Sequence, residues 1–450
     1  MNYKNSQQFW KNLPSHGTIW TAAVAAGVYG IIVVLLDLAI AHRFGTGQQA
    51  ATFQASFFVL TFLTSVISGG AVFGAFVPIY VRLAKNSKSN DARTFSTHAG
   101  LRLGLWLMVA AMIVGATSPI LFKIIASGFT GRHQDELVLV TRLMLPMLIG
   151  HGLASVLVAV LLSIGRVGLA QLSPALLPLC ALAGYPLWNE HVGARILAIG
   201  FVAGALLQTV LLYAALRRWH AEPLWARRDA AISACVREFF HAYSITAVAH
   251  VLSSCIFLAN QAIAGALSAK DWSVFSYATR LPMLAMAFLT TVAVNLLLPY
   301  FSVLVQEGGL RGAWHKVIYI GKWIMIVLIP IALLWAGSAD WLVKILYVHG
   351  AFSLDDAAIV ANVQRLFVLQ IPLNMFGIVC WRMHNALERG RPLVFASLGA
   401  LAIDLVVALP ASQVMGVPGI AMAHTIAIAV WAAALFVGLW AQKGKALPGV

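Results

Sequence analysis

The sequence predicts an all-α polytopic membrane protein with about 12 transmembrane helices in two parallel six-helix lobes. The first observation is composition, because 61% of the residues are hydrophobic and only 10% are charged, whereas a soluble domain is roughly half apolar and a quarter charged. The second is that apolar stretches of roughly 18 residues or more, long enough to cross a bilayer, recur about a dozen times. The third is that the second half of the chain repeats the first.

The apolar stretches define twelve expected spans, with boundaries uncertain by several residues. No alternating pattern of about ten residues suggests membrane strands. The segment 337–358 is expected to be a loop, with Ser353 capping the helix that follows. The spans are 18–41, 51–81, 99–122, 138–164, 169–188, 194–216, 239–265, 273–303, 317–336, 359–381, 392–414 and 417–440.

The internal repeat emerges when the chain is shifted against itself by a little over 220 residues. LFKII at 121–125 falls on LVKIL at 342–346, and a Phe-Thr or Phe-Ser pair follows each. Further matches share nearly the same shift, and duplicated apolar chains are typical of transporters. These matches are Asp37 with Asn260, Pro78 with Pro299, Arg142 with Arg365, and Gly165-Arg166 with Gly390-Arg391.

The repeat divides the chain into an N-terminal lobe at 1–216, a basic linker at 217–235 and a C-terminal lobe at 236–450. Six helices per lobe is an even number, so both lobes enter the membrane from the same side and are parallel repeats. Such lobes can open a central cleft to each face of the membrane in turn.

Positive charge predicts the orientation of the chain. The 30 Lys and Arg residues outnumber the 15 Asp and Glu residues, and most of them fall in loops on one side of the predicted spans. The positive-inside rule then places both termini in the cytoplasm. Topology and attraction to the bilayer's anionic headgroups account for the basic excess, so no nucleic-acid partner is expected.

Four polar residues within the spans are candidates for function, because charges in hydrocarbon are costly. Arg280 and Ser276 lie four residues apart on one helix face, and we expect them to bind substrate. A guanidinium suits phosphate because it donates two parallel hydrogen bonds and stays charged. Alternatively, Arg280 extends to the membrane surface or pairs with Asp37 to tie the lobes together. Asp37 and Asp404 are candidates for ion coupling or gating, with a structural hydrogen bond the alternative for Asp37.

Motifs for nucleotide and metal chemistry are missing from the sequence. GxxxxGK[ST] does not occur, so we expect no ATP hydrolysis. The four cysteines form no CxxC motif and the 13 histidines no HExxH motif. We therefore expect neither a catalytic site nor a metal or cofactor. Energy is expected to come from a coupled ion, H⁺ or Na⁺, or from the membrane potential.

Several segments resemble the MviN or MurJ family of lipid II flippases, in the multidrug/oligosaccharidyl-lipid/polysaccharide (MOP) exporter superfamily. They are GGAVFGAFVPIYVRL at 69–83, SYATRLPMLAMAFLTTVAVNLLLP at 276–299, ILYVHGAFSLDDA at 345–357 and NALERGRPLVFASLGALAIDLVV at 385–407. The resemblance implies the MOP flippase fold, with a V-shaped cavity between the lobes. It also implies a flippase that carries an undecaprenyl-pyrophosphate-linked saccharide, such as a peptidoglycan precursor, between the leaflets of the bacterial inner membrane. We expect a monomer that works beside glycan polymerase or glycosyltransferase machinery.

The chain departs from this family's pattern at its charged positions. By ungapped matching, the positions of the family's cavity arginines on the first two helices hold Gly30, Leu36 and Thr64 or Ser65 in this chain. The position just before Arg280, where the family usually has an acidic residue, holds Thr279. The two extra helices of lipid II flippases are also expected to be absent. These departures favour a relative that moves another lipid-linked saccharide, such as an exopolysaccharide repeat unit.

Two other function classes remain open. A cation-coupled multidrug or small-molecule exporter of the same superfamily would need acids in its cavity, and Asp37 and Asp404 are the deep acids of this chain. A membrane glycan polymerase or glycosyltransferase would need acids or histidines on a large exterior loop. Only His349, Asp355 and Asp356 cluster outside, in a short loop, so the enzyme is the least favoured reading.

Overall fold

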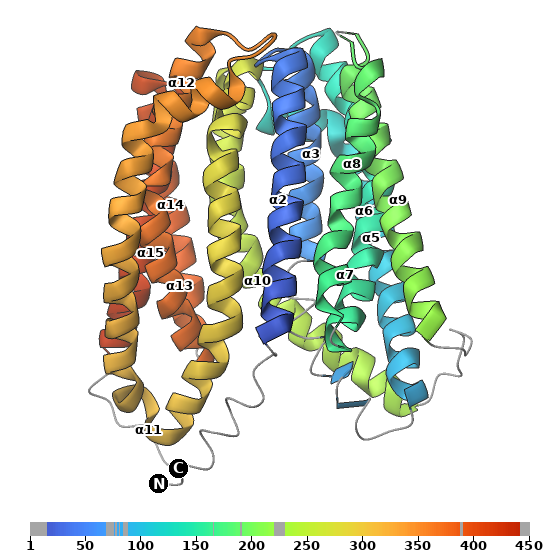
Figure 1. Ribbon diagram of the computed structural model, residues 1–450, viewed down its shortest axis with the longest axis vertical. Helices are drawn as coiled ribbons and strands as arrows, with labels where there is room; N and C mark the ends of the chain where they lie inside the picture. The colour runs from blue at the N-terminus through green and yellow to red at the C-terminus, as the bar shows by residue number, and fades with distance from the viewer. Residues whose placement is uncertain are drawn as a thin grey trace.

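The structure is a computed structural model that describes residues 16–68, 76, 79–80, 82–83, 89–164, 166–189, 191–219, 230–387 and 390–441. Across these residues the regular structure is helical and contains no strand, which confirms the predicted all-α class. Helices of the two halves stand side by side, roughly along one axis (Figure 1).

The first half of the chain forms long helices joined by short turns. Two short 3₁₀ helices flank α8, where Pro174 and Pro186 stand near their starts. The elements are α2 (His16–Phe44), α3 (Gln48–Ser68), α5 (Ser89–Ile125), α6 (Arg132–Ser163), α7 (Val167–Leu172), η1 (Ser173–Ala175), α8 (Leu176–Ala183), η2 (Tyr185–Leu187) and α9 (Gly193–Trp219).

The second half forms six helical elements, of which α11 is 79 residues long. A straight helix of that length would extend about 120 Å, but Figure 1 shows that α11 doubles back on itself and so supplies two of the predicted spans. The elements are α10 (Ala230–Leu267), α11 (Ala269–Tyr347), α12 (Leu354–Val368), α13 (Gln370–Ala386), α14 (Arg391–Met415) and α15 (Val417–Trp440).

The predicted spans agree with the helices. Each of the twelve falls on helical residues, although the span 51–81 continues past Ser68 into residues that are only partly described. Within the described part of the chain, nine helices are long and apolar enough to cross a membrane. The protein is therefore a multi-pass membrane protein.

The prediction of a loop at 337–358 is wrong for most of its length. Helix α11 continues to Tyr347 and α12 begins at Leu354, so only a short turn separates them. The apolar run from Trp341 to Tyr347 extends the helix, and no glycine or proline interrupts it. The expected cap is confirmed, because the Ser353 hydroxyl accepts a hydrogen bond of 3.1 Å from the Asp356 amide.

Helix α10 contacts both halves of the chain. Near its start, Val236 and Phe239 pack against Phe95 of α5 in one apolar cluster. Close to its other end, Asn260 bonds to α14. Helices α9 and α10 both extend into the predicted linker 217–235, and residues 220–229 lie outside the described residues. The division at this linker stays a prediction.

An exposed ion pair accompanies the start of α10. Arg82 of the first half and Glu238 of α10 lie 2.6 Å apart. The hydrogen bond that Arg82 donates to the Glu238 carboxylate raises the pKa of Arg82 above its ordinary value. Both side chains are about half exposed, so solvent weakens this pair and it contributes little to stability.

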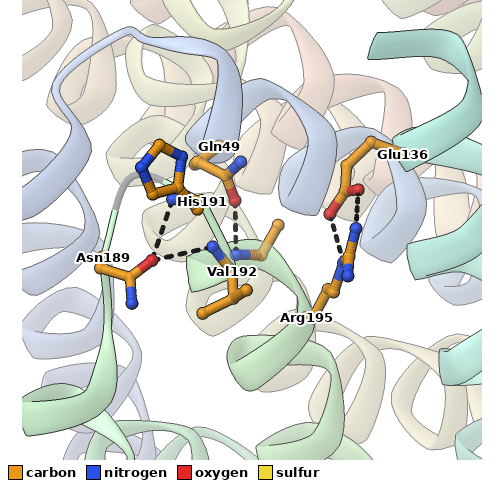
Figure 2. Close-up of polar contacts among 7 residues, drawn as sticks. Gln49, Glu136, Asn189, His191, Val192 and Arg195 are labelled. Carbon is orange, nitrogen blue, oxygen red and sulfur yellow. Dashed lines mark hydrogen bonds and ion pairs between the residues drawn. The ribbon is translucent and has the colours of Figure 1, made fainter. Parts of the chain in front are cut away.

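The start of α9 is tied to two neighbouring helices (Figure 2). The Asn189 carboxamide accepts hydrogen bonds of 2.9 Å from the amides of His191 and Val192, which turns the chain into the helix. Gln49 of α3 accepts a bond of 2.8 Å from the Ala194 amide. Arg195 donates two hydrogen bonds to Glu136 of α6, at 2.7 and 2.5 Å. These contacts fasten α3, α6 and α9 together at one end of the first half.

The repeat extends to individual hydrogen bonds. Arg142 of α6 donates to the Gly115 carbonyl of α5 at 3.0 Å. That carbonyl has no backbone donor, because the residue four positions later is Pro119, and the Ser118 hydroxyl also donates to it at 3.0 Å. In the second half, Arg365 donates to the Ala336 carbonyl at 3.1 Å. Shifts of 223 and 221 residues relate these two pairs, so the duplication is structural as well as sequential.

Candidate functional site

The candidate site centres on an ion pair between the two halves of the chain. Arg280 Nε of α11 lies 2.8 Å from Asp37 Oδ2 of α2. The Arg280 side chain is 27% exposed, whereas that of Asp37 is 4% exposed. Arg280 lies about 17 Å along α11 from Ala269, roughly half the thickness of a hydrocarbon core. The two residues predicted for substrate binding and for gating are therefore in contact.

Ser276 lies one turn before Arg280 and is also held across a helix interface. The Gln261 amide of α10 donates a hydrogen bond of 2.9 Å to the Ser276 hydroxyl. Gln261 is buried and Ser276 is half-buried. Ser276 and Arg280 share a face of α11, as predicted from their spacing. This face therefore presents a hydroxyl and a guanidinium next to each other, each fixed by a partner on another helix.

Asp404 belongs to a separate polar cluster within the second half. The Asn260 amide nitrogen lies 3.1 and 3.0 Å from the two carboxylate oxygens of Asp404. The same nitrogen lies 2.9 Å from His424 Nδ1 of α15. All three residues are buried, and Phe367 stacks on the imidazole with ring centroids 5.0 Å apart. Helices α10, α14 and α15 thus place an acid, an amide and an imidazole together.

The structure does not bring the two predicted ion-coupling residues together. Asp37 pairs with Arg280, and Asp404 with Asn260. In the repeat Asn260 occupies the place of Asp37, so equivalent positions serve different partners. Asp37 links the halves, whereas Asn260 links helices of one half.

The cluster His349, Asp355 and Asp356 does not converge on a common point. His349 bonds to the carbonyl of Ile345 in its own segment, and Asp355 is exposed. Asp356 is buried and accepts a hydrogen bond from Thr46 at 2.8 Å. Over the described residues, no group of three or more His, Cys, Asp or Glu could hold a metal ion. This arrangement does not resemble a general acid–base site.

The positions where the chain departs from the family pattern carry no charge into the site. Leu36 is buried in the apolar core. The hydroxyls of Thr64 and Thr279 bond to carbonyls of their own helices, at 2.7 and 2.8 Å. A side chain at Gly30 would meet no atom within 4 Å. None of these residues places a positive charge beside Arg280.

Sequence reasoning missed several residues of the site. Gln261 and Asn260 are adjacent polar residues in an otherwise apolar span, and that pair was a usable signal. The ring of His424, a lone histidine in an apolar span, lies in the Asp404 cluster. Tyr277 donates a hydrogen bond of 3.0 Å to the Gly45 carbonyl, and no sequence pattern pointed to that contact.

Comparison with known proteins decides the family. The model of the family described as "Lipid II flippase MurJ" matches residues 40–448. The chain belongs to the MurJ family. A curated relative from Rhizobium tropici, named a probable lipid II flippase MurJ, is 23% identical over 442 residues, covering 94% of this chain and 80% of the relative.

Solved structures show the same fold. A structure titled "Lipid II flippase MurJ, inward closed conformation" matches with a TM-score of 0.77 at 15% identity, over 93% of this chain and 87% of that one. An inward-facing multidrug resistance MATE family transporter of the MOP superfamily also matches with a TM-score of 0.77, at 14% identity, over 94% and 98% of the two chains. The MOP fold is confirmed, and this MurJ family member is a transporter that catalyses no chemical reaction.

Proposed function

We propose that this MurJ family member is a flippase that moves a polyprenyl-pyrophosphate-linked saccharide from the cytoplasmic to the outer leaflet of the bacterial inner membrane. The observation that carries the proposal is Arg280, a permanent positive charge about 17 Å from the start of α11 and held at the contact between the two halves. Family membership supports a lipid-linked glycan as the substrate.

The chemistry of the substrate explains why such a protein is needed. Transfer of a charged, hydroxyl-rich headgroup into hydrocarbon has a large free-energy cost, whereas the isoprenoid tail of the lipid is soluble in hydrocarbon. A protein path for the headgroup alone removes the penalty. Arg280 would bind a phosphate oxygen pair, and the neighbouring Ser276 would donate a hydrogen bond. Phosphate would then replace Asp37 as the partner of Arg280, which couples substrate binding to a contact between the halves.

We further propose a substrate less demanding of positive charge than lipid II, such as an exopolysaccharide repeat unit. The support is the set of uncharged residues at the family's arginine positions, namely Gly30, Leu36 and Thr64 or Ser65. Because Arg280 is the one arginine kept from the family's cavity arginines, the phosphates of the substrate would keep more of their contacts with water.

Transport would follow alternating access, with the Asp404 cluster as the site of ion coupling. A buried carboxylate beside an amide and an imidazole can take up H⁺ or Na⁺ at little structural cost. Uptake at Asp404 would alter the contacts between α10 and α14. Because Asn260 and Gln261 are neighbours, that change would reach Ser276 through one hydrogen bond.

The basic loops support an orientation with both termini in the cytoplasm. In this orientation the α2–α3 and α10–α11 turns face the outside. The protein would act as a monomer and deliver its product to glycan polymerase or glycosyltransferase machinery on the outer face. It needs no bound cofactor, because flipping breaks no covalent bond.

A multidrug exporter is the second candidate, and the ion pair counts against it. A cationic drug would need a free carboxylate, but Asp37 is already neutralised by Arg280 at 2.8 Å. Binding a cation at Asp37 would leave Arg280 unpaired and next to another positive charge. An anionic headgroup also displaces one member of the pair, but it binds the more exposed member, because the Arg280 side chain is 27% exposed and that of Asp37 is 4% exposed.

The test is leaflet accessibility of a labelled polyprenyl-pyrophosphate saccharide in proteoliposomes. We expect wild-type protein to equilibrate the label between leaflets, Arg280→Gln to slow it at least about tenfold, and Arg280→Lys to retain part of the rate. Arg142→Gln is the matched control, because it makes the same substitution at an arginine whose described contact, with the Gly115 carbonyl, lies within the first half. Unchanged transport in Arg280→Gln would remove Arg280 from the mechanism. Transport of a cationic dye in place of the glycolipid would favour the exporter.

A further inference from the structure

The end of the molecule that holds the α2–α3 and α10–α11 turns, here called the distal end, joins the two halves through their backbones. The Ala351 amide donates to the His42 carbonyl at 2.9 Å. The Gly128 amide donates to the Gly265 carbonyl, also at 2.9 Å. Adding 223 to residues 128 and 42 gives 351 and 265, so the duplication relates these two bonds to each other. Each half therefore donates an equivalent backbone hydrogen bond to the other half.

Close approach of the backbones at the distal end requires glycine. Gly350 has φ of +65°, and a Cβ there would lie 2.2 Å from the His42 carbonyl oxygen. A Cβ on Gly128 would lie 2.6 Å from the Gly265 carbonyl oxygen. Backbone cannot move aside as a flexible side chain can. The symmetric contact is thus a tightly closed seam between the halves.

Side chains add a second layer of contacts, and this layer is not symmetric. Thr46 in the α2–α3 turn donates a hydrogen bond of 2.8 Å to Asp356 Oδ2 of α12. Lys270 of α11 lies 2.6 Å from Asp356 Oδ1. The repeat equivalents of Thr46 and Asp356 are Ala269 and His133, which cannot form the same bond. One side of the seam therefore carries a charge-assisted link that the other lacks.

Asp356 is suited to hold the distal end closed and to release it. Its side chain is 8% exposed, and it has a partner in each half of the chain. Lys270 lies in the same half as Asp356, so it keeps the carboxylate ionised and oriented when the halves separate. Thr46 lies in the other half, so its bond must break for the distal end to open. Within this side-chain layer, opening costs one charge-assisted hydrogen bond and leaves no charge unpaired; the two backbone bonds and the bond from Tyr277 to the Gly45 carbonyl also break.

We propose that Thr46, Asp356 and Lys270 form a latch that sets the balance between the state closed at the distal end and the state open there. This inference rests on the alternating access of the proposed function and names the residues that regulate it. The latch works through Thr46 on one side and Asp356 on the other, while Lys270 positions the acid. Weakening the latch shifts the protein toward the open state without touching Arg280.

The test measures the conformation directly, in full-length protein in lipid nanodiscs. Spin labels on cysteines at Arg132 and Lys344, exposed residues near the distal ends of the two halves, report their separation. The four native cysteines are first replaced by alanine. We expect Thr46→Val and Asp356→Asn each to raise the ratio of open to closed protein about tenfold, since each variant weakens or removes a hydrogen bond to a charged group.

Matched variants control for chemistry and charge. Thr209→Val removes a hydroxyl bond of 2.8 Å to the Gly150 carbonyl within one half, and Asp355→Asn removes a neighbouring exposed charge from the same helix end. Thr46→Ser keeps the donor. We expect all three to give wild-type distances. A wild-type distance distribution in both Thr46→Val and Asp356→Asn, or an equal shift in the controls, would overturn the latch. No glycolipid is present, so a failure of transport leaves this result unaffected and tests only the proposed function.

Discussion

The ion pair between Arg280 and Asp37 makes a quantitative prediction, because its two members are buried to different degrees. Arg280→Ala leaves the Asp37 carboxylate, 4% exposed, without its partner. Removing one partner from a buried pair costs about 3–5 kcal/mol. Asp37→Asn leaves a guanidinium that is 27% exposed and can recover part of its hydration. We therefore expect the second variant to lose only about 1–2 kcal/mol.

The assay is the free energy of unfolding from denaturant titrations in detergent micelles, for wild type, both single variants and the double variant. The double variant should lose less than the sum of the singles, because it leaves no lone charge. Lys344→Ala, on the exposed surface, should stay within about 0.5 kcal/mol of wild type. Equal losses in the two single variants, or additive losses in the double variant, would refute the argument from burial.

Three further predictions follow from contacts of the described residues. Arg142→Met should lower the free energy of unfolding by about 1 kcal/mol, because it removes one hydrogen bond and leaves the Gly115 carbonyl with the Ser118 hydroxyl as a donor; a loss below the error of a denaturant titration would contradict this. Gly350→Ala should cost at least about 1 kcal/mol in the same titration, since its φ is +65° and the added Cβ meets the His42 carbonyl. Asp404→Asn should abolish the dependence of glycolipid transport on an imposed ion gradient, while Ser412→Ala, elsewhere on α14, should leave it intact; an unchanged gradient dependence would remove Asp404 from coupling.

Hydropathy predicted the helices well because membrane spans obey one strong rule, the internal pairing of every backbone group. Loop limits were harder to predict. The segment from Trp341 to Tyr347 was assigned to a loop, although its apolar character continues helix α11 beyond the expected hydrophobic thickness. Hydropathy alone cannot separate a helix that extends past the bilayer from the turn that ends it.

The candidate site was partly predictable, for a reason that can be stated physically. Arg280, Asp37 and Asp404 stood out because each is a charge in an apolar span. Their partners Asn260, Gln261 and His424 are neutral, so insertion cost did not mark them. Pairing also depends on which helices adjoin in space. The contact between Asp37 and Arg280 was one of the alternatives considered, and only the structure could choose it.

The duplication gives a way to separate architecture from function. Contacts that the repeat preserves, such as Arg142 to Gly115 and Arg365 to Ala336, serve the fold of each half. The residues of the candidate site break the repeat instead. A shift of 223 places Phe57 opposite Arg280 and Asn260 opposite Asp37, and the shift that aligns Gly165 with Gly390 places Leu179 opposite Asp404.

This pattern is expected if the sequences of two originally similar halves diverged and the differences give transport its direction. A transporter with identical halves could bind its headgroup equally from either half, and nothing in its charges would distinguish them. Arg280 and Asp404 lie in the second half and Asp37 in the first, so in the proposed function headgroup and ion both act on the second half. Movement of that half would then break its contacts with the first, which include the pair with Asp37 and the bond from Thr46 to Asp356. In the proposed function, the direction of transport is therefore set by contacts at which the two halves differ.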